Sequence, residues 1–507
     1  MASDFRKFSE SPASSSSTSP SSTSPSSTSP ASTPLGTTPD EPDFSENDRR
    51  FILVIGGLGY IGSHTSLELL KAGFNVIIVD NLSNCFEDVL YRIKKLANDH
   101  FSDQDSAGPL LLFHRLDYLS ESMRFLLESY VDMIPCSTRS STSPESLTCN
   151  TSTENGFTYR SRIAAVIHFA ASKSVVDSIS RPLHYYKNNV CGLVALLELL
   201  KSFGICNFVF SSSATLYGNA AESGCPLREE DSVHYPELST DASGSPILIQ
   251  PKVEGLSSPY ARTKHVCEAI LADIAAADPL WRIAALRYFN PVGCERTGLL
   301  GERPRCQASN LFPVITQVLT GERPALDIFG SDYPTTDGTP VRDFVHVVDV
   351  AKGHIAAIKL WLSPPHCFSP LSSSPFRTYN LGSGDGTTVL EAVRSLEKAS
   401  GKTVPIRWCD RRPGDVGYCV ASNDRAKREL NWSPVENIER CAADSWNFVR
   451  RNMSPLDQTD IHDGSALTRP QPASARFNGD LVARLDEVKN DVASLPMPRM
   501  EHSVIAI

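Results

Sequence analysis

The 507-residue chain lacks any apolar run as long as a membrane-spanning helix, which needs about 20 such residues. Its first residues also lack the apolar segment of a signal peptide, so we expect neither an anchor nor a secretory leader. Positive charge is not in excess, because 48 basic and 58 acidic side chains give a formal charge of −10. This balance argues against a broad electrostatic surface for nucleic acid or an acidic membrane.

Paired cysteines are also missing. The 13 cysteines are scattered, odd in number and never arranged as Cys-x-x-Cys. Without a leader, this pattern predicts reduced thiols in a cytosolic protein. We predict no metal site.

Composition divides the chain into segments. Residues 1–48 are rich in Ser, Thr and Pro and cannot bury a core, so we predict disorder there. Similar stretches at about 135–160, 239–258 and 363–376 indicate surface insertions, which cost little loop-closure entropy. We predict that residues 453–507 form a mostly flexible tail with one short helix, whose apolar residues fall at helical spacing: Leu481, Leu485, Val488, Val492 and Leu495.

Strands and helices alternate between these insertions. The strand candidates are 51–56, 75–80, 110–114, 164–169, 207–213 and 283–288. Helical patterns fall at 61–72, 86–98, 120–130, 182–203 and 260–277. Four runs, "FILVI", "NVIIVD", "AAVIHFA" and "FVFSSS", are continuously apolar rather than alternating, which is typical of parallel strands covered on both faces. The order predicts an α/β fold with a doubly wound parallel (Rossmann) sheet.

Three glycines, Gly56, Gly59 and Gly62, stand between the first strand candidate and the first helical pattern. A dinucleotide pyrophosphate approaches main-chain N–H groups closely at such a helix start, where a Cβ would block it. Asp80 ends the second strand candidate, where an acid accepts bonds from ribose hydroxyls and repels a 2′-phosphate. The pattern therefore predicts NAD rather than NADP as the cofactor.

Tyr260 and Lys264 lie four residues apart and hence on one face of a helix. An ammonium and an oxidised nicotinamide both favour the phenolate, so Tyr260 is a candidate base near neutral pH. The serines at 211–213 end a strand candidate at the sheet edge where ligands bind, and one of them could relay a proton.

These features bring out a resemblance to a known family. The chain resembles the extended short-chain dehydrogenase/reductases, and within them the UDP-glucose (UDP-galactose) 4-epimerase family, over about residues 51–450. The motifs that carry the resemblance are "GGLGYIGSH", "VDNLSN", "HFAASKSV", "YYKNNV", "SSSATLYG", "PYARTK", "RYFNPVG", "IFGSDYPTTDGTPVRDFVHVVD", "YNLGSG" and "RRPGDV". It implies an NAD-binding domain at 51–290 and a smaller mixed α/β lobe for the UDP-sugar at 291–452.

The resemblance also implies the roles of individual residues. Tyr260 would be the base, Lys264 its partner at the nicotinamide ribose, and Ser213 the hydroxyl that touches the sugar. The residues implied around NAD are Gly56, Gly59, Tyr60, Ile61, Gly62, Asp80, Asn81, Asp117, Phe169, Ala170, Lys173, Asn188, Tyr260, Lys264 and Tyr288. Those implied around the UDP-sugar are Lys173, Ser213, Tyr260, Asn290, Asn310, Arg342, Arg412, Asp415 and Cys419.

The implied reaction interconverts UDP-galactose and UDP-glucose: C4 is oxidised, the 4-keto sugar turns over, and C4 is reduced from the other face. Cys419 aligns with a wall of the sugar pocket that is bulky in some relatives, so UDP-GlcNAc and UDP-GalNAc are further candidate substrates. The family also implies a homodimer formed through the helices at 182–203 and 260–277.

Two other readings stay open at this point. A nucleotide-sugar 4,6-dehydratase or a decarboxylase could use the same fold, although a dehydratase needs an acid/base pair where this chain has Ser213-Ala214-Thr215. A non-catalytic NAD-sensing regulator is the other reading, although such proteins usually lose the Tyr/Lys pair.

Overall fold

The computed structural model describes residues 49–102, 108–135, 153–154, 157–240, 245–305, 308–363, 374–412 and 415–453. The predictions for residues 1–48, for the amphipathic stretch 481–495 and for most of 363–376 lie outside this range. Among the described residues, no helix is long and apolar enough to cross a membrane.

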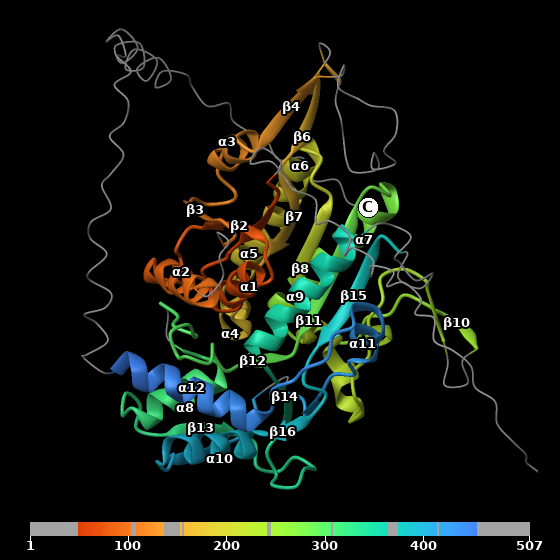
Figure 1. The fold of residues 1–507 in the computed structure, drawn as a ribbon. Helices are drawn as coiled ribbons and strands as arrows, with labels where there is room; N and C mark the ends of the chain where they lie inside the picture. Colours follow the sequence, from red (N-terminus) through yellow and green to blue (C-terminus); the bar gives the residue numbers. More distant parts are fainter. Residues whose placement is uncertain are drawn as a thin grey trace, which may run out of the picture. The chain divides into compact units, whose positions relative to one another are not determined.

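A seven-stranded parallel sheet forms the centre of the fold (Figure 1). The strand order is β15-β11-β8-β7-β1-β2-β3. Strands are added on one side of β1 first and then on the other, as in doubly wound sheets. The strands are β1 (Phe51–Ile55), β2 (Asn75–Asp80), β3 (Leu111–Arg115), β7 (Ile163–His168), β8 (Asn207–Ser213), β11 (Arg282–Tyr288) and β15 (Phe376–Leu381). The doubly wound sheet and the six strand predictions are confirmed.

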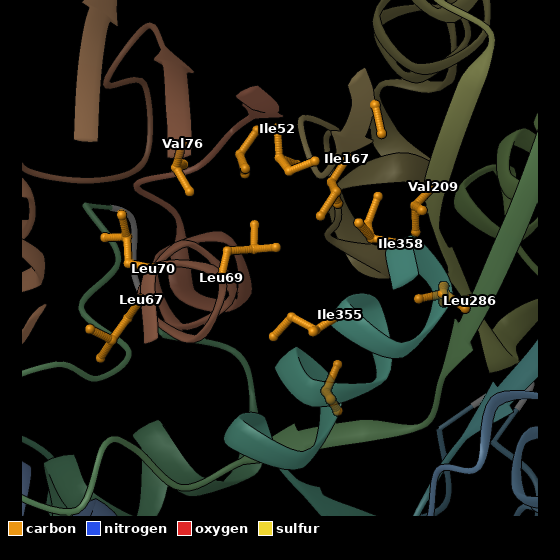
Figure 2. Packing of buried hydrophobic residues seen from close by; sticks show 14 of the residues in the cluster. Ile52, Leu67, Leu69, Leu70, Val76, Ile167, Val209, Leu286, Ile355 and Ile358 are labelled. Atoms are coloured by element: carbon orange, nitrogen blue, oxygen red, sulfur yellow. The ribbon is translucent and has the colours of Figure 1, made fainter. Parts of the chain in front are cut away.

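Helices cover both faces of this sheet, because alternate residues of each strand point to opposite sides. One face packs against α1 (Tyr60–Lys71), α2 (Asp88–Phe101) and α9 (Val347–Leu362). Figure 2 shows this core, with Leu69 of α1 and Ile355 and Ile358 of α9 facing the apolar side chains of the sheet. The other face packs against α3 (Ser122–Glu128), α6 (Gly192–Ser202) and α7 (Pro259–Ala277).

The expected helix at 182–203 is three consecutive segments. It consists of α5 (Pro182–Tyr185), the π-helical segment η3 (Tyr186–Cys191) and α6. The short helix α4 (Val175–Ser180) precedes them. A π-helical turn adds a residue to the helix and is frequent at functional sites; η3 includes Asn188, one of the expected cofactor residues.

The second lobe is built from short strands and three helices. Its core lies between α8 (Leu311–Leu319), α10 (Val389–Ser400) and α12 (Ile438–Met453). The strands are β12 (Asn290–Val292), β14 (Val341–His346), β16 (Gly386–Thr388) and β18 (Tyr418–Cys419), together with the separate parallel pair β13 (Leu326–Phe329) and β17 (Ile406–Cys409). The mixed α/β character predicted for this lobe is therefore present.

Helix α9 and strand β15 come from the range expected for the second lobe, 291–452, yet both belong to the large sheet and its cover. Helix α11 (Asp424–Leu430) also packs against β15 and α9. The chain thus returns to the cofactor half after entering the second lobe, and a single division at 290 does not describe its path. The described residues from Arg50 onward form one compact unit.

Two of the expected insertions contain strands. β4 (Val131–Pro135), β5 (Thr153–Glu154) and β6 (Phe157–Ser161) form a small antiparallel sheet. β9 (Glu237–Thr240) and β10 (Pro246–Ile249) form a hairpin on which Leu238 and Leu248, opposite each other, are largely exposed.

Candidate active site

The start of helix α7 places Tyr260 at the end of the central sheet. Ser258 caps the helix, because its hydroxyl accepts a bond from the Ala261 N–H at 3.2 Å, and Pro259 supplies the fixed φ of a first helical residue. Tyr260 therefore occupies the first turn, where its side chain is 9% exposed.

The phenol of Tyr260 is hydrogen-bonded to the Ser213 hydroxyl. Burial raises the pKa of Tyr260 to about 12, and the bond from Ser213 lowers it only in part. The residues of the chain alone therefore do not make this phenol a base at neutral pH. The predicted base needs the positive charge of an oxidised nicotinamide beside the ring, in addition to Lys264.

Lys264 is anchored to the strand rather than to the phenol. Its Nζ donates to the Ser211 carbonyl at 2.5 Å and lies 4.7 Å from the Phe210 ring centroid and 5.9 Å from that of Tyr260. Burial lowers the pKa of Lys264 to about 8, since few groups around it compensate the lost water. The ammonium is held ready for a partner at the cofactor edge.

Tyr288 lies directly opposite Ser213 in the register of β8 and β11. Its hydroxyl is hydrogen-bonded to Nε2 of His354, a residue of α9 that the sequence did not single out. Burial lowers the pKa of His354 to about 4, so the ring is neutral and its Nδ1, 2.9 Å from the Val350 carbonyl, carries the proton. Burial raises the pKa of Tyr288, and the Tyr260 phenol raises it further by a smaller amount.

The glycine turn fits a dinucleotide pyrophosphate. Gly56 has a φ of +78°, which favours glycine, and a Cβ at Gly62 would lie 2.2 Å from the Gly56 carbonyl oxygen. A Cβ at Gly59, in contrast, would have only that carbonyl within 4 Å, so this position borders open space. No side chain caps α1 and no acid stands in its first turn, which leaves its N–H groups available for an anion.

Tyr60 and Ile61 open this helix. The Tyr60 hydroxyl donates to the Gly293 carbonyl at 2.7 Å, which joins the glycine turn to the chain entering the second lobe. Ile61 packs against the core beneath the turn. The side chains of both residues pack within the fold, so we expect these residues to contact a cofactor through their main-chain atoms.

Asp80 closes the turn from the neighbouring strand. Its carboxylate accepts from the N–H groups of Leu58, at 3.0 Å, and Leu82, at 2.9 Å. Asn81 donates to Asp117 at 3.2 Å, so the two expected adenosine contacts lie side by side. Asp80 thus orders the loop in addition to the ribose contact implied for it.

The loop after β7 runs beside the glycine turn. The main chain of Ala170 lies against Gly56, since a Cβ on that glycine would approach the Ala170 nitrogen to 2.8 Å. The Phe169 ring lies 4.8 Å from that of His354. Asn188, from η3, donates to Asn189 at 3.0 Å.

A carboxylate that the sequence did not single out, Glu302, connects the two halves. Lys173 lies 3.3 Å from it and Asn310 donates to the same oxygen at 3.0 Å. Glu302 also raises the pKa of Tyr60, after the larger effect of burial. Two residues expected to contact ligands, Lys173 and Asn310, therefore share one acid.

In the second lobe, Arg342, Arg412 and Asp415 lie together. Asp415 lies 3.2 Å from Arg412 and 3.7 Å from Arg342. The Arg412 guanidinium lies over the Phe329 ring, 4.3 Å from its centroid. Two guanidinium groups and an aromatic face suit a phosphate-bearing nucleotide. Phe329 was not named among the expected site residues, although it stands in the motif "IFGSDYPTTDGTPVRDFVHVVD".

Cys419 and Asn290 lie on the strands around Arg342. Cys419 pairs with Arg342 in the register of β18 and β14, and packs against the apolar cluster of η4 (Ala214–Ser223), the segment that follows Ser213. Burial raises the pKa of Cys419 to about 11. The amide of Asn290 donates to the Asp343 carbonyl at 3.0 Å.

Comparison with known proteins agrees with this geometry. The NAD dependent epimerase/dehydratase family matches residues 52–366. The chain belongs to this family. A UDP-glucose 4-epimerase of Bacillus subtilis (strain 168) is 39% identical over 403 residues, which are 80% of this chain and 98% of the relative.

Two solved structures extend the comparison. The UDP-glucose 4-epimerase of Bifidobacterium longum, in complex with NAD+ and UDP, is 34% identical with a TM-score of 0.62, and the match covers 80% of this chain and 99% of that one. The enzyme of Stenotrophomonas maltophila, with NAD and formylated UDP-arabinopyranose, is also 34% identical, with a TM-score of 0.63 and the same coverage. The match thus spans nearly the whole length of these relatives, and NAD is the cofactor of this chain.

Proposed function

We propose that this chain is a UDP-glucose 4-epimerase that interconverts UDP-galactose and UDP-glucose. The observation that carries the proposal is the phenol of Tyr260, bonded to Ser213, beside Lys264 and at the same sheet edge as the glycine turn. The relatives compared above bear that enzyme's name and match nearly their whole length.

Each catalytic residue has a defined task in this proposal. Tyr260 removes the proton of the sugar 4-hydroxyl, and Ser213, already bonded to it, orients that hydroxyl. Lys264 binds the nicotinamide ribose and adds positive charge near the phenol. Bound NAD would supply the hydride acceptor and donor for C4, which would make the reaction redox-neutral overall.

The second lobe supplies binding rather than chemistry. Arg342 and Arg412 hold the diphosphate, Asp415 accepts from ribose hydroxyls, and Asn290 and Asn310 complete the grip. Because the 4-keto sugar must turn over, the binding energy belongs on UDP and the hexose needs a permissive pocket. Lys173 and Asn310 both contact Glu302, which supports a role for Lys173 in binding NAD and the UDP-sugar.

The identity of the product would decide between the alternative functions. Purified protein incubated with UDP-galactose should form UDP-glucose, and mass analysis of the denatured supernatant should find released NAD. A 4-keto-6-deoxy product would mean a dehydratase, loss of carbon dioxide from a UDP-uronic acid would mean a decarboxylase, and bound NAD without turnover would mean a regulator.

N-acetylated sugars are the second substrate pair that we propose. Cys419 is a small side chain between Arg342 and the segment after Ser213, so it leaves room beside the sugar. The wild type should epimerise UDP-GlcNAc, and Cys419→Tyr should abolish that activity while keeping UDP-galactose turnover. Absence of UDP-GlcNAc turnover in the wild type would contradict the proposal.

We further infer a cytosolic homodimer formed through 182–203 and 260–277. The nine cysteines among the described residues are all free thiols, which suits a reducing compartment. Leu183 is 82% exposed at the start of the first helix, and Val176 and Ile179 of α4 are exposed nearby in sequence. Leu183→Glu should convert the dimer to a monomer in sedimentation, whereas Val435→Glu, at another exposed apolar position, should not.

A further inference from the structure

Side chains of helix α7 contact the last three residues of strand β8. Three helix residues spaced four apart lie on one face and meet three consecutive serines. The pairs are Lys264 with the Ser211 carbonyl, Glu268 with the Ser212 hydroxyl, and Tyr260 with the Ser213 hydroxyl. Two of these pairs belong to the proposed catalytic machinery, and the third, Ser212 with Glu268, does not.

Glu268 is a fully buried carboxylate with every acceptor position filled. Oε1 accepts from Ser212 and from Arg287 Nε at 3.1 Å. Oε2 accepts from Arg287 at 2.7 Å and from His234 Nε2 at 3.0 Å. Burial alone would raise the pKa of Glu268, but the Arg287 guanidinium and the bond from His234 hold it well below its usual range. The carboxylate is therefore charged at every pH of interest.

Arg287 ties this carboxylate to the sheet. It is fully buried on β11, directly opposite Ser212 in the strand register. Its remaining donors reach the Tyr217 hydroxyl at 3.0 Å and the Ser232 carbonyl at 2.8 Å. A two-pronged guanidinium–carboxylate contact has a defined geometry, so it fixes the helix in one position over two neighbouring strands.

We propose that Ser212, Glu268 and Arg287 form a positioning cluster that sets the distance between the Tyr260 phenol and the Ser213 hydroxyl. Ser212 and Ser213 are neighbours on β8, and Glu268 lies two turns along α7 from Tyr260. A shift of the helix at Glu268 therefore moves the phenol relative to Ser213. The inference rests on the proposed epimerase function and concerns residues that touch neither substrate nor cofactor.

The test variant is Ser212→Ala. Glu268→Gln is the obvious choice, but it leaves Arg287 buried without its charge partner and could prevent folding. Ser212→Ala removes one hydroxyl and keeps the ion pair. We expect kcat for UDP-galactose to fall about tenfold, less than the roughly hundredfold cost of misplacing a group by a full ångström. KM and the NAD content should stay at wild-type values.

A matched control separates positioning from general loss of packing. Ser395→Ala removes another buried serine hydroxyl, one that bonds only the Ala392 carbonyl of its own helix at 2.7 Å in the second lobe. It should lower the melting temperature, by less than Ser212→Ala because it breaks a neutral bond rather than one to a carboxylate, and leave kcat unchanged.

Two further readouts respond to the phenol itself. The acid limb of the kcat profile should move to higher pH in Ser212→Ala, because the bond from Ser213 lowers the pKa of Tyr260. The phenol carbon signal of Tyr260 in NAD-loaded protein, assigned with Tyr260→Phe, should titrate with the same shift. A role in stability alone would move neither.

The outcomes are distinct. Wild-type kcat and an unshifted profile in Ser212→Ala would overturn the positioning cluster while the epimerase assignment stands. A fall in stability without a shift in the profile would also overturn it. An inactive wild type that binds NAD would instead remove the proposed function on which the inference rests.

Discussion

The proposed catalytic edge of the sheet and the proposed phosphate-binding face of the second lobe are built in opposite ways. At the catalytic edge, Tyr260 and Lys264 are 9% and 3% exposed, and each already has its bond to β8. In the second lobe, the Arg412 side chain is 54% exposed, and its hydrogen-bonding partner is Asp415, three residues away.

The difference follows from the tasks of the two regions. Proton transfer depends on the distance between two atoms, so its groups are held in place before the substrate arrives. Phosphate binding depends on charge, and two arginines can exchange an internal carboxylate for a stronger anion. The first region is buried throughout, whereas the second ranges from Arg412, with a side chain 54% exposed, to Arg342, at 17%.

Loss of the phenol should have the largest effect. Tyr260→Phe removes the base, and we expect kcat to fall about 10³-fold, since general acid–base groups contribute 10²–10⁴. Bound NAD should remain, because the glycine turn is untouched. The comparison variant is Tyr235→Phe, which removes an exposed hydroxyl bonded to Asp273 and should keep full activity. Residual activity within tenfold of wild type would place the base elsewhere.

The desolvated ammonium should be visible in stability. Burial lowers the pKa of Lys264 from 10.5 to about 8 in the folded chain. Between these values the unfolded chain binds a proton that the folded chain has released, so the free energy of unfolding rises with pH. Relative to Lys264→Met, the NAD-free wild type should gain about 3 kcal/mol across this window.

Denaturation at a series of pH values measures this gain, with Lys71→Met, at a half-buried surface lysine, as the baseline. A difference between wild type and Lys264→Met that does not change with pH would mean that water reaches the ammonium. The contrast between a buried catalytic edge and a more solvent-exposed second lobe would then be wrong.

The smallest effect is expected in the second lobe. Arg342→Ala removes one charged contact to the diphosphate, which is worth about 1.5–3 kcal/mol, so KM for UDP-galactose should rise roughly 10- to 100-fold. kcat should change little, because this binding is uniform between ground and transition states. Arg407→Ala, which breaks only an exposed pair with Asp327, is the control in steady-state kinetics. A lower kcat at unchanged KM would contradict the division of tasks.

Much of the cofactor half could be predicted because its signals are local. β1, β2 and β7 are nearly continuous apolar runs, and β8 begins with one before its serines. The second lobe could not be predicted in detail, since β12, β16 and β18 have only two or three residues and show no period. The return of β15 to the sheet depends on long-range pairing with β11 that no local pattern records.

The site shows the same division. Tyr260, Lys264, Ser213 and the glycines stand in motifs whose spacing carries their chemistry, and the structure brings Tyr260, Lys264 and Ser213 together. The residues elsewhere in the chain that contact these motifs were not predicted. Glu302 meets residues of both halves, and nothing in its own surroundings in the sequence marks it.

By itself, the sequence determined the type of fold, the cofactor and the family, because strand hydrophobicity, glycine spacing and motif order are properties of adjacent residues. Only the tertiary structure decided which charged groups are buried and which acidic and basic side chains form ion pairs. Burial and pairing depend on residues far apart in the chain: Arg287 and Glu268 neutralise each other in the interior, and the phenol of Tyr260 is left with a raised pKa until its cofactor binds.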